Sequence, residues 1–267
     1  MVRQVNSVTV TDRRAAPSVG EPVTLTSVSK VFGRGSSAVR ALDQVSLGVP
    51  PGEFTCLIGA SGCGKSTLLS LVAGLEQPTS GEVSTGGARV AFMFQEPALF
   101  PWLTAAGNVE LALRARGLGK PERRQRTREL LDTVHLTGFG AKRPHELSGG
   151  MRQRVALARA LAQDADVLLM DEPFGALDAM TRDVLHDELD RICAERRLTV
   201  LFVTHNVREA VRLGDRVVVL SSRPGRVIAE FDVPIERPRR IDSAPVAELA
   251  AQITDRLREE MSSDVNR

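Results

Sequence analysis

Four short apolar runs, each ending abruptly in polar residues, constrain the fold of this chain more than any other feature. "FTCLI" runs into Gly59, "VAFMF" into Gln95, "VLLM" into Asp171 and Glu172, and "VLFVT" into His205. Continuous apolar strands separated by helical stretches indicate a mostly parallel sheet that is covered on both faces. Ligands of such sheets bind at the carboxyl ends of the strands. The pattern therefore predicts an α/β fold with one active site assembled where the four runs end.

The first run continues into a sequence that matches the phosphate-binding pattern GxxxxGK[ST], formed by Gly59, Ala60, Ser61, Gly62, Cys63, Gly64, Lys65, Ser66 and Thr67. Its glycines allow backbone N–H groups to surround phosphate oxygens, and the following helix presents its positive end to them. We expect Lys65 to reach the β- and γ-phosphates and Ser66 to offer its hydroxyl to Mg²⁺. A simple glycine-rich turn is the alternative, but the strand before it and the amphipathic helix after it favour a phosphate loop.

The third run leads into an acidic pair. Asp171 is placed to bind Mg²⁺, usually through water, and Glu172 to polarise the attacking water as a general base. Such a pair alone is commonly a helix cap or a turn, whereas a neighbouring phosphate loop favours catalysis. Gln95 and His205 have a similar alternative, in which each only caps its strand. Their shared position at strand ends favours a place in the site.

Composition limits the classes of partner. The 267 residues include 35 basic and 33 acidic ones, so a net charge of +2 gives no general attraction to nucleic acid. The basic run at residues 123–128 is interleaved with polar residues and flanked by Glu122 and Glu129, which is typical of a solvated helix face. Three cysteines form no disulfide framework and suit a reducing compartment. No apolar run approaches the roughly 20 residues that cross a bilayer, so we expect a soluble, intracellular protein.

A second anion-binding pattern, "LSGGMRQR", opens a later helix with Ser148, Gly149 and Gly150. With this pattern added to the phosphate loop, "FQEP", "LLMDEPFGALD" and "VTH", the chain resembles the nucleotide-binding subunit of an ABC transporter. The five motifs occur in the family's order, between about residues 23 and 227. The resemblance implies ATP hydrolysis with Mg²⁺. It also implies a P-loop NTPase (RecA-like) core of mostly parallel sheet, with an N-terminal antiparallel β subdomain and an inserted α-helical subdomain.

The resemblance also implies a role for each motif residue. Phe32 would stack on the adenine ring, with a core aromatic as the alternative. Gln95 would touch Mg²⁺ and the attacking water, Glu172 would be the catalytic base, and His205 would contact the γ-phosphate. Further contacts to the nucleotide would come from the signature residues Ser148, Gly149 and Gly150 and the D-loop residue Asp178. The ligands of Mg²⁺ would be Ser66, Gln95 and Asp171.

Two departures from the family pattern are mild. Gly175 stands where serine is common in the D-loop, which would alter communication between subunits slightly. Asn206 follows His205 where aspartate is common, two steps from the chemistry. The motif set therefore supports hydrolysis despite both departures.

One ATP is not expected to touch the phosphate loop and the signature of the same chain. In a head-to-tail pair, however, the signature of each chain can close over the γ-phosphate held by the other. We therefore expect a homodimer or a pair of related cassettes, in which dimerisation is a condition of catalysis.

The stretch "FQEPALFPWLTAAGNV" resembles importer ATPases of the nitrate, sulfonate and taurine group. Its apolar residues Phe100, Pro101, Trp102 and Leu103 either anchor the helical subdomain to the sheet or line a groove for a short helix of the permease. The resemblance implies integral-membrane permease subunits and, indirectly, an external solute-binding protein. It places the protein in the cytoplasm, held at the inner face of the cell membrane by the permease.

The remaining patterns divide the chain. Residues 23–32 and 39–49 read as strands, residues 108–116 and 121–136 as helices of the insertion, and residues 244–261 as a final helix. The expected parts are a flexible tail (residues 1–20), an ABC ATPase domain (21–240, with a helical subdomain at about 96–150) and a C-terminal helical tail (241–267).

Two other functions compete with the importer ATPase. A non-transport ABC ATPase of DNA repair or translation would call for a long coiled-coil insertion or for two cassettes in one chain, and neither is present. A small-molecule kinase has no need of "LSGGMRQR" and would require a separate acceptor site. The histidines His135, His145 and His186 do not follow strand ends and are expected to be surface or packing residues.

Overall fold

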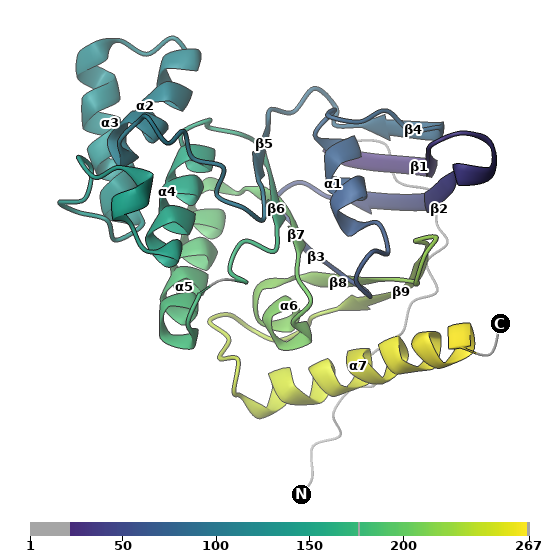
Figure 1. The fold of residues 1–267 in the computed structure, drawn as a ribbon. Helices are drawn as coiled ribbons and strands as arrows, with labels where there is room; N and C mark the ends of the chain where they lie inside the picture. The colour runs from purple at the N-terminus through teal and green to yellow at the C-terminus, as the bar shows by residue number, and fades with distance from the viewer. Residues whose placement is uncertain (1–21, 176, 266–267) are drawn as a thin grey trace, which may run out of the picture. The chain divides into compact units, whose positions relative to one another are not determined.

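The computed structural model describes residues 22–175 and 177–265, which divide into two compact units (Figure 1). The first unit contains residues 22–86 and 202–265, and the second contains residues 87–175 and 177–201. Strand β7 (Thr199–Val203) spans the position in the chain where the second unit ends and the first resumes. The expected flexible tail, residues 1–20, lies outside the described residues. The phosphate loop belongs to the first unit and the signature segment to the second.

The first unit contains a three-stranded antiparallel sheet with the order β2-β1-β4. Its strands are β1 (Val23–Phe32), β2 (Val39–Val49) and β4 (Ser80–Ser84), and a short 3-10 helix, η1 (Gly35–Ser37), lies between β1 and β2. Alternation along β1 buries Val23 and Leu25 completely, as expected of a strand with one face in the core. Residues 23–32 and 39–49 are thus strands with the predicted bounds. No alternation predicts β4, because its sequence "SGEVS" is short, polar and largely exposed.

A second set of strands in the first unit carries the phosphate loop. Strand β3 (Phe54–Ile58) pairs in parallel with β8 (Arg216–Leu220), and β8 pairs antiparallel with β9 (Val227–Asp232). Every residue of β3 is buried, which explains its continuous apolar sequence. The helices of this unit are α1 (Lys65–Val72), α6 (Val207–Leu213) and α7 (Ala244–Val265). Helix α6 packs against β3 and β8, and α7 packs beside α6 (Figure 1).

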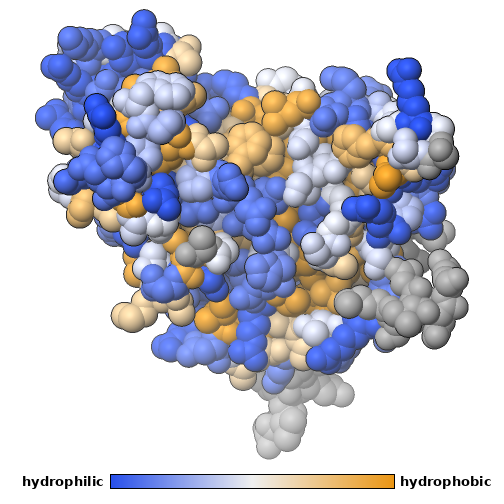
Figure 2. All heavy atoms as spheres, viewed as in Figure 1, coloured by the Kyte–Doolittle hydropathy of each residue, from blue (hydrophilic) through white to orange (hydrophobic). Residues whose placement is uncertain are grey.

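The second unit pairs β5 (Val90–Met93) in parallel with β6 (Val167–Asp171). Its helices are α2 (Ala105–Ala115), α3 (Lys120–Thr133), α4 (Gly149–Leu161) and α5 (Ala179–Arg196), with a 3-10 turn η2 (Pro144–Glu146) before α4. Helices α2, α3 and α4 pack on one another, and α4 also packs on β5. Hydrophilic side chains gather over α2 and α3 at the upper left of Figure 2, as expected for the basic run at residues 123–128.

Both units combine helices with parallel strands, and the first adds an antiparallel sheet. The predicted α/β class with a mostly parallel sheet and an antiparallel β subdomain is therefore confirmed. Within the described part of the chain, no helix is both long and apolar enough to cross a membrane.

Candidate functional site

The phosphate loop lies between the end of β3 and the start of α1 and requires glycine at specific positions. Gly62 and Gly64 have φ angles of +77° and +100°, in the left-handed region that favours glycine. A Cβ on Gly64 would lie 2.6 Å from Cδ2 of Leu42 and 2.8 Å from the carbonyl oxygen of Ala41. The loop therefore keeps its shape only with glycine at position 64.

Lys65 places a positive charge inside this loop. Its side chain is buried, and Nζ donates to the carbonyl oxygens of Gly59 and Ala60, both at 2.9 Å. Nζ also lies 3.7 Å from Sγ of Cys63. These neutral acceptors hold the ammonium where a phosphate anion would replace them with stronger, charge-assisted bonds. The geometry is therefore that of a preorganised anion site.

Phe32, at the end of β1, is 40% exposed, so it is not the core aromatic of the alternative interpretation. Nζ of Lys30 lies 4.9 Å from the centroid of its ring and is fixed by bonds to Glu76 (2.7 Å) and to the carbonyl oxygen of Gln77 (2.8 Å). An exposed, supported ring suits stacking on a base. The stacking itself stays a prediction.

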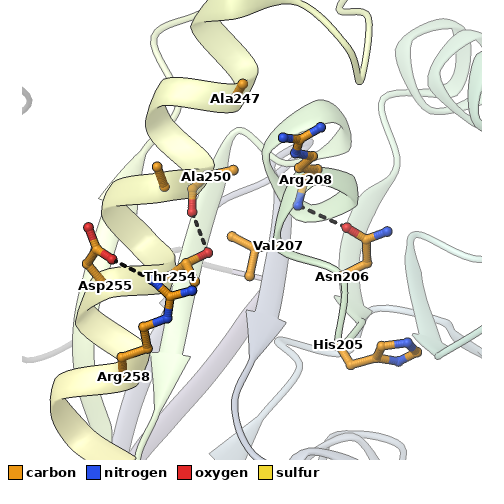
Figure 3. A pocket seen from close by; sticks show the side chains of 10 residues that line it. His205, Asn206, Val207, Arg208, Ala247, Ala250, Thr254, Asp255 and Arg258 are labelled. Carbon is orange, nitrogen blue, oxygen red and sulfur yellow. Dashed lines mark hydrogen bonds and ion pairs between the residues drawn. The ribbon is translucent and has the colours of Figure 1, made fainter.

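His205 lies in the loop between β7 and α6, with its imidazole ring directed away from α7 (Figure 3). The preceding Thr204 is buried, and its N–H donates to the carbonyl oxygen of Leu57 at the end of β3 (3.3 Å). The Thr204 hydroxyl donates to the buried carboxylate of Glu209 and accepts from the N–H of Asn206 (3.0 Å). Thr204 and Glu209 thus fix the backbone on both sides of His205, although the sequence motifs assign a role to neither.

Asn206 caps α6, because its Oδ1 accepts from the N–H groups of Arg208 (3.1 Å) and Glu209 (3.2 Å). Aspartate would make the same bonds, so the departure at this position keeps the cap. A cavity of about 530 Å³ lies between this loop and α7, lined by His205 and Asn206 on one side and by Ala247, Ala250 and Thr254 on the other (Figure 3). No residue of the phosphate loop lines this cavity, so it is not the place of the phosphates.

In the second unit, Ser148 begins the signature helix α4. Its hydroxyl accepts from the N–H of Met151 (3.2 Å), which makes it the N-cap. Ser148, Gly150 and Asp178 line one cavity of about 500 Å³, together with Arg154 and His135. The structure therefore brings the signature and D-loop residues together.

Asp178 caps α5 in the same way, because its Oδ1 accepts from the N–H of Thr181 (2.9 Å). This bond is the main reason why the pKa of Asp178 lies below its ordinary value. A carboxylate thus remains ionised at the edge of the signature cavity at neutral pH.

Gln95 follows β5 with an exposed side chain, and helix α4 holds its backbone. Nε2 of the buried Gln153 donates to the carbonyl oxygen of Gln95 (3.0 Å). The guanidinium of Arg159 donates to the carbonyl oxygens of Pro97 and Ala98, both at 2.8 Å. The signature helix therefore fixes the start of the loop that contains Gln95, a link that no sequence motif shows.

Asp171 is the buried last residue of β6, and Glu172 follows it with a φ of +43°. A left-handed conformation is uncommon for glutamate, and backbone strain of this kind concentrates at functional positions. The N–H of Gly175 donates to the carbonyl oxygen of Glu172 (3.2 Å). A Cβ on Gly175 would lie 3.6 Å from that oxygen, so the serine common in the D-loop would fit.

Within each unit, the structure thus brings some of the expected site residues into defined geometry. The first unit holds residues 59–67, Phe32 and His205, and the second holds Gln95, Asp171, Glu172 and the signature cavity. The assembly of one site from both groups stays a prediction, as do the individual roles.

An α/β fold with this glycine loop and its internal lysine defines a nucleotide-binding P-loop protein. Residues 42–175 match the family model described as ABC transporter, so the chain belongs to the ABC transporter family. A dimeric ATP-binding cassette, MJ0796, solved in a post-hydrolysis state with ADP and phosphate, has a similar fold. Its TM-score is 0.73 at 35% sequence identity, over 80% of this chain and 100% of that chain.

Several curated relatives are named import proteins. The chain is 48% identical to the aliphatic sulfonates import ATP-binding protein SsuB 1 of Mesorhizobium japonicum, over 81% of this chain and 82% of the relative. It is also 48% identical to the taurine import ATP-binding protein TauB of Burkholderia pseudomallei, over 79% of this chain and 84% of the relative. The family and the subgroup inferred from the motifs therefore agree with these similarities.

Proposed function

We propose that this protein is the ATP-binding and ATP-hydrolysing subunit of an ABC importer for a sulfonate, taurine, nitrate or a similar small solute. The observation that carries the proposal is the Lys65 ammonium held inside the glycine loop at 2.9 Å from two carbonyl oxygens. The import functions named for the sulfonate and taurine relatives support the solute group. The permease and an external binding protein would select the solute.

The substrate is MgATP, whose Mg²⁺ neutralises charge on the phosphates. Lys65 and the N–H groups of the loop bind the β- and γ-phosphates, while the Ser66 hydroxyl and Asp171 face the metal ion. Glu172 takes a proton from water as the water oxygen bonds to the γ-phosphorus and the bond to the leaving ADP oxygen breaks. Gln95 orients the water, and His205 contacts the γ-phosphate.

The second half of each site comes from a partner cassette. Ser148 and Gly150 line a cavity with Asp178 at the start of helix α4, not in a loop that surrounds phosphates. Closed over the γ-phosphate of a partner, the N-terminus of α4 would supply N–H donors and the positive end of the helix. Closure and reopening of the pair would drive alternating access in the permease.

An exposed aromatic pair in the second unit suits the permease. Trp102 is 68% exposed, and its ring centroid lies 5.4 Å from that of Phe100. The buried Asn108 fixes Phe100, accepting from its N–H (2.8 Å) and donating to its carbonyl oxygen (3.3 Å). This rigid apolar surface favours the groove interpretation, in which a short permease helix holds the protein at the cytoplasmic face of the membrane.

The Glu172→Gln variant tests the chemistry. We expect it to bind ATP normally while turnover falls by about 10²–10⁴-fold, because a general base is lost and the shape is kept. Glu122→Gln, an exposed carboxylate on α3, is the matched control and should hydrolyse at the normal rate. Normal turnover of Glu172→Gln would overturn the assignment of the base. Co-purification with a polytopic membrane protein tests the transport role separately.

A further inference from the structure

The segment between β8 and β9, residues 221–226, lies against the phosphate loop. Nε of Arg223 donates to the carbonyl oxygen of Gly62 at 3.2 Å, and Nη2 lies 3.1 Å from the position of a Cβ on Gly62. Gly225 is even closer, since a Cβ there would come within 2.1 Å of the carbonyl oxygen of Cys63. The phosphate loop is thus contacted by a third segment, in addition to the strand and helix that it joins. We call residues 221–226 the bracing segment.

The bracing segment is itself anchored to β2. The N–H of Gly225 donates to the carbonyl oxygen of Ala41 (2.9 Å), and its carbonyl oxygen accepts from the N–H of Asp43 (3.0 Å). Arg226 forms an ion pair with the buried carboxylate of Asp43, whose Oδ1 accepts from Arg40 (3.0 Å). These bonds at one end make the segment a fixed support rather than a loose loop.

Internal bonds hold the turn that presents Arg223. The hydroxyl of Ser221 donates to the carbonyl oxygen of Pro224 (2.9 Å) and accepts from the N–H of Arg226 (2.9 Å). The N–H of Ser221 also donates to the carbonyl oxygen of Arg226 (2.9 Å). The guanidinium of Arg223 is therefore aimed at the phosphate loop by a closed turn.

The bond from Arg223 controls one peptide unit of the loop. A trans peptide points its C=O and its N–H in opposite directions. Arg223 binds the C=O of Gly62, while the N–H of Cys63 donates to the carbonyl oxygen of Ala60 (3.3 Å). Both ends of this peptide are thus held, and with them the left-handed φ of +77° at Gly62.

We propose that the bracing segment preorganises the phosphate loop, and that Arg223 is a positioning residue that acts through Gly62 on the affinity for MgATP. The inference rests on the proposed function only in taking MgATP as the ligand of the loop. Without Arg223, the peptide between Gly62 and Cys63 keeps only the bond from the N–H of Cys63, so it is less ordered before binding and ordering it reduces the affinity. Once nucleotide is bound, the loop is ordered in either case, so the chemical step is unchanged.

Titration calorimetry with MgATP on the purified full chain tests this proposal. We expect Arg223→Ala to weaken MgATP binding about five- to tenfold, as for the loss of one charge-assisted hydrogen bond. The KM for ATP should rise by the same factor, while kcat at saturating ATP stays within about twofold. Arg223→Lys keeps the charge without the planar donors, and we expect it to restore less than half of the lost affinity.

Arg240→Ala is the matched control, because Arg240 is an exposed arginine of the same unit that is paired only with Asp242 in the described structure. It removes the same charge and should leave the affinity unchanged. Unfolding temperatures without nucleotide should agree for both variants, which separates positioning from folding. Wild-type affinity in Arg223→Ala, full restoration by Arg223→Lys, or an equal loss in Arg240→Ala would overturn the proposal. Failure of the wild-type chain to bind MgATP would instead overturn the proposed function.

Discussion

The molecule has two glycine-containing loops suited to an anion, and they are built differently. The phosphate loop has φ angles of +77° and +100° at Gly62 and Gly64, an internal lysine and a bracing segment. The signature segment is an ordinary capped helix start, with Ser148 at φ −63° and ψ 164°. Neither Gly149 nor Gly150 has a positive φ. The phosphate loop can thus surround a phosphate by itself, whereas the signature segment offers only a surface that can close over a phosphate bound by another chain.

The surroundings of Gly64 and Gly149 show the same difference. A Cβ on Gly64 would collide with backbone and side-chain atoms at 2.8 and 2.6 Å, so its small size is needed for the fold of its own chain. The nearest atom to a Cβ on Gly149 is a guanidinium nitrogen of Arg152 at 3.9 Å, which is ordinary contact. Packing within one chain therefore does not require glycine at position 149. This is expected if the nucleotide of a partner fills the space beside it.

The largest effect is expected from Gly64→Ala. Left-handed strain and overpacking should each destabilise the loop by about 1–3 kcal/mol, and MgATP binding should become undetectable by calorimetry. Gly74→Ala is the control, since Gly74 has a φ of +69° but no atom within 4 Å of its Cβ position. Retained binding in Gly64→Ala would mean that the cradle is not the nucleotide site.

Ser148→Arg should separate the two loops. The monomer should bind ATP nearly as well as the wild type, while ATP-driven pairing disappears and turnover falls at least about 100-fold, because the donors facing the γ-phosphate are blocked. Thr104→Ala removes an equivalent cap from α2, where the Thr104 hydroxyl accepts from Gly107 N–H (3.0 Å), and controls for lost helix stability. Sedimentation with and without ATP measures the pairing, and full turnover in Ser148→Arg would contradict the composite site.

Gly149→Ala sharpens the contrast with Gly64. The free energy of unfolding of this variant should stay the same or rise by up to about 1 kcal/mol, because alanine favours a helix more than glycine does. Turnover should nevertheless fall by about tenfold, since the added methyl displaces the partner's reacting phosphate. Thermal unfolding and steady-state hydrolysis on one preparation check both parts. If hydrolysis is unchanged, Gly149 does not face a nucleotide.

The smallest effect concerns the anchor of the bracing segment. The hydrogen bond from Arg226 is the main reason why the pKa of Asp43 lies below its ordinary 3.8. A depressed pKa stabilises the folded state above about pH 4, and this contribution is lost as the pH falls through the lowered pKa. The gap in unfolding temperature between the wild type and Asp43→Asn should therefore be largest at pH 7 and shrink as the pH falls below about 4. A constant gap would show that the ion pair does not support the fold.

Local sequence patterns predicted much of this structure, because the burial of each strand or helix determines where its own apolar residues lie. Alternating apolar residues identified β1 and β2 to the residue, and continuous apolar sequence identified the buried β3 and β6. The helices of the insertion were predicted within about three residues of their ends. Strands β4 and β9 gave no such signal, because β4 is polar and β9 is half-exposed beside β8.

The supports of the site could not be predicted in the same way. Arg223 and Gly62 are 161 positions apart, and Gln153 and Gln95 are 58 apart. Nothing in the sequence around Arg223 or Gln153 indicates which residue it contacts, because each contact depends on how distant segments of the chain pack. Motifs therefore predict which groups do chemistry, whereas the structure is needed to find what holds those groups in place.

We expect each catalytic site to combine the phosphate loop of one chain with the signature of another. Mixing Glu172→Gln with Ser148→Arg before ATP is added tests it most directly, because each variant alone is inactive. A head-to-tail hybrid has one intact site, from the phosphate loop of the Ser148→Arg chain and the signature of the Glu172→Gln chain. Each hybrid has one of its two sites intact, so ATPase activity should return in proportion to the hybrid fraction, to roughly a quarter of the wild-type value where pairing is random. No recovery, with hybrid pairs detected by native mass spectrometry, would contradict the claim.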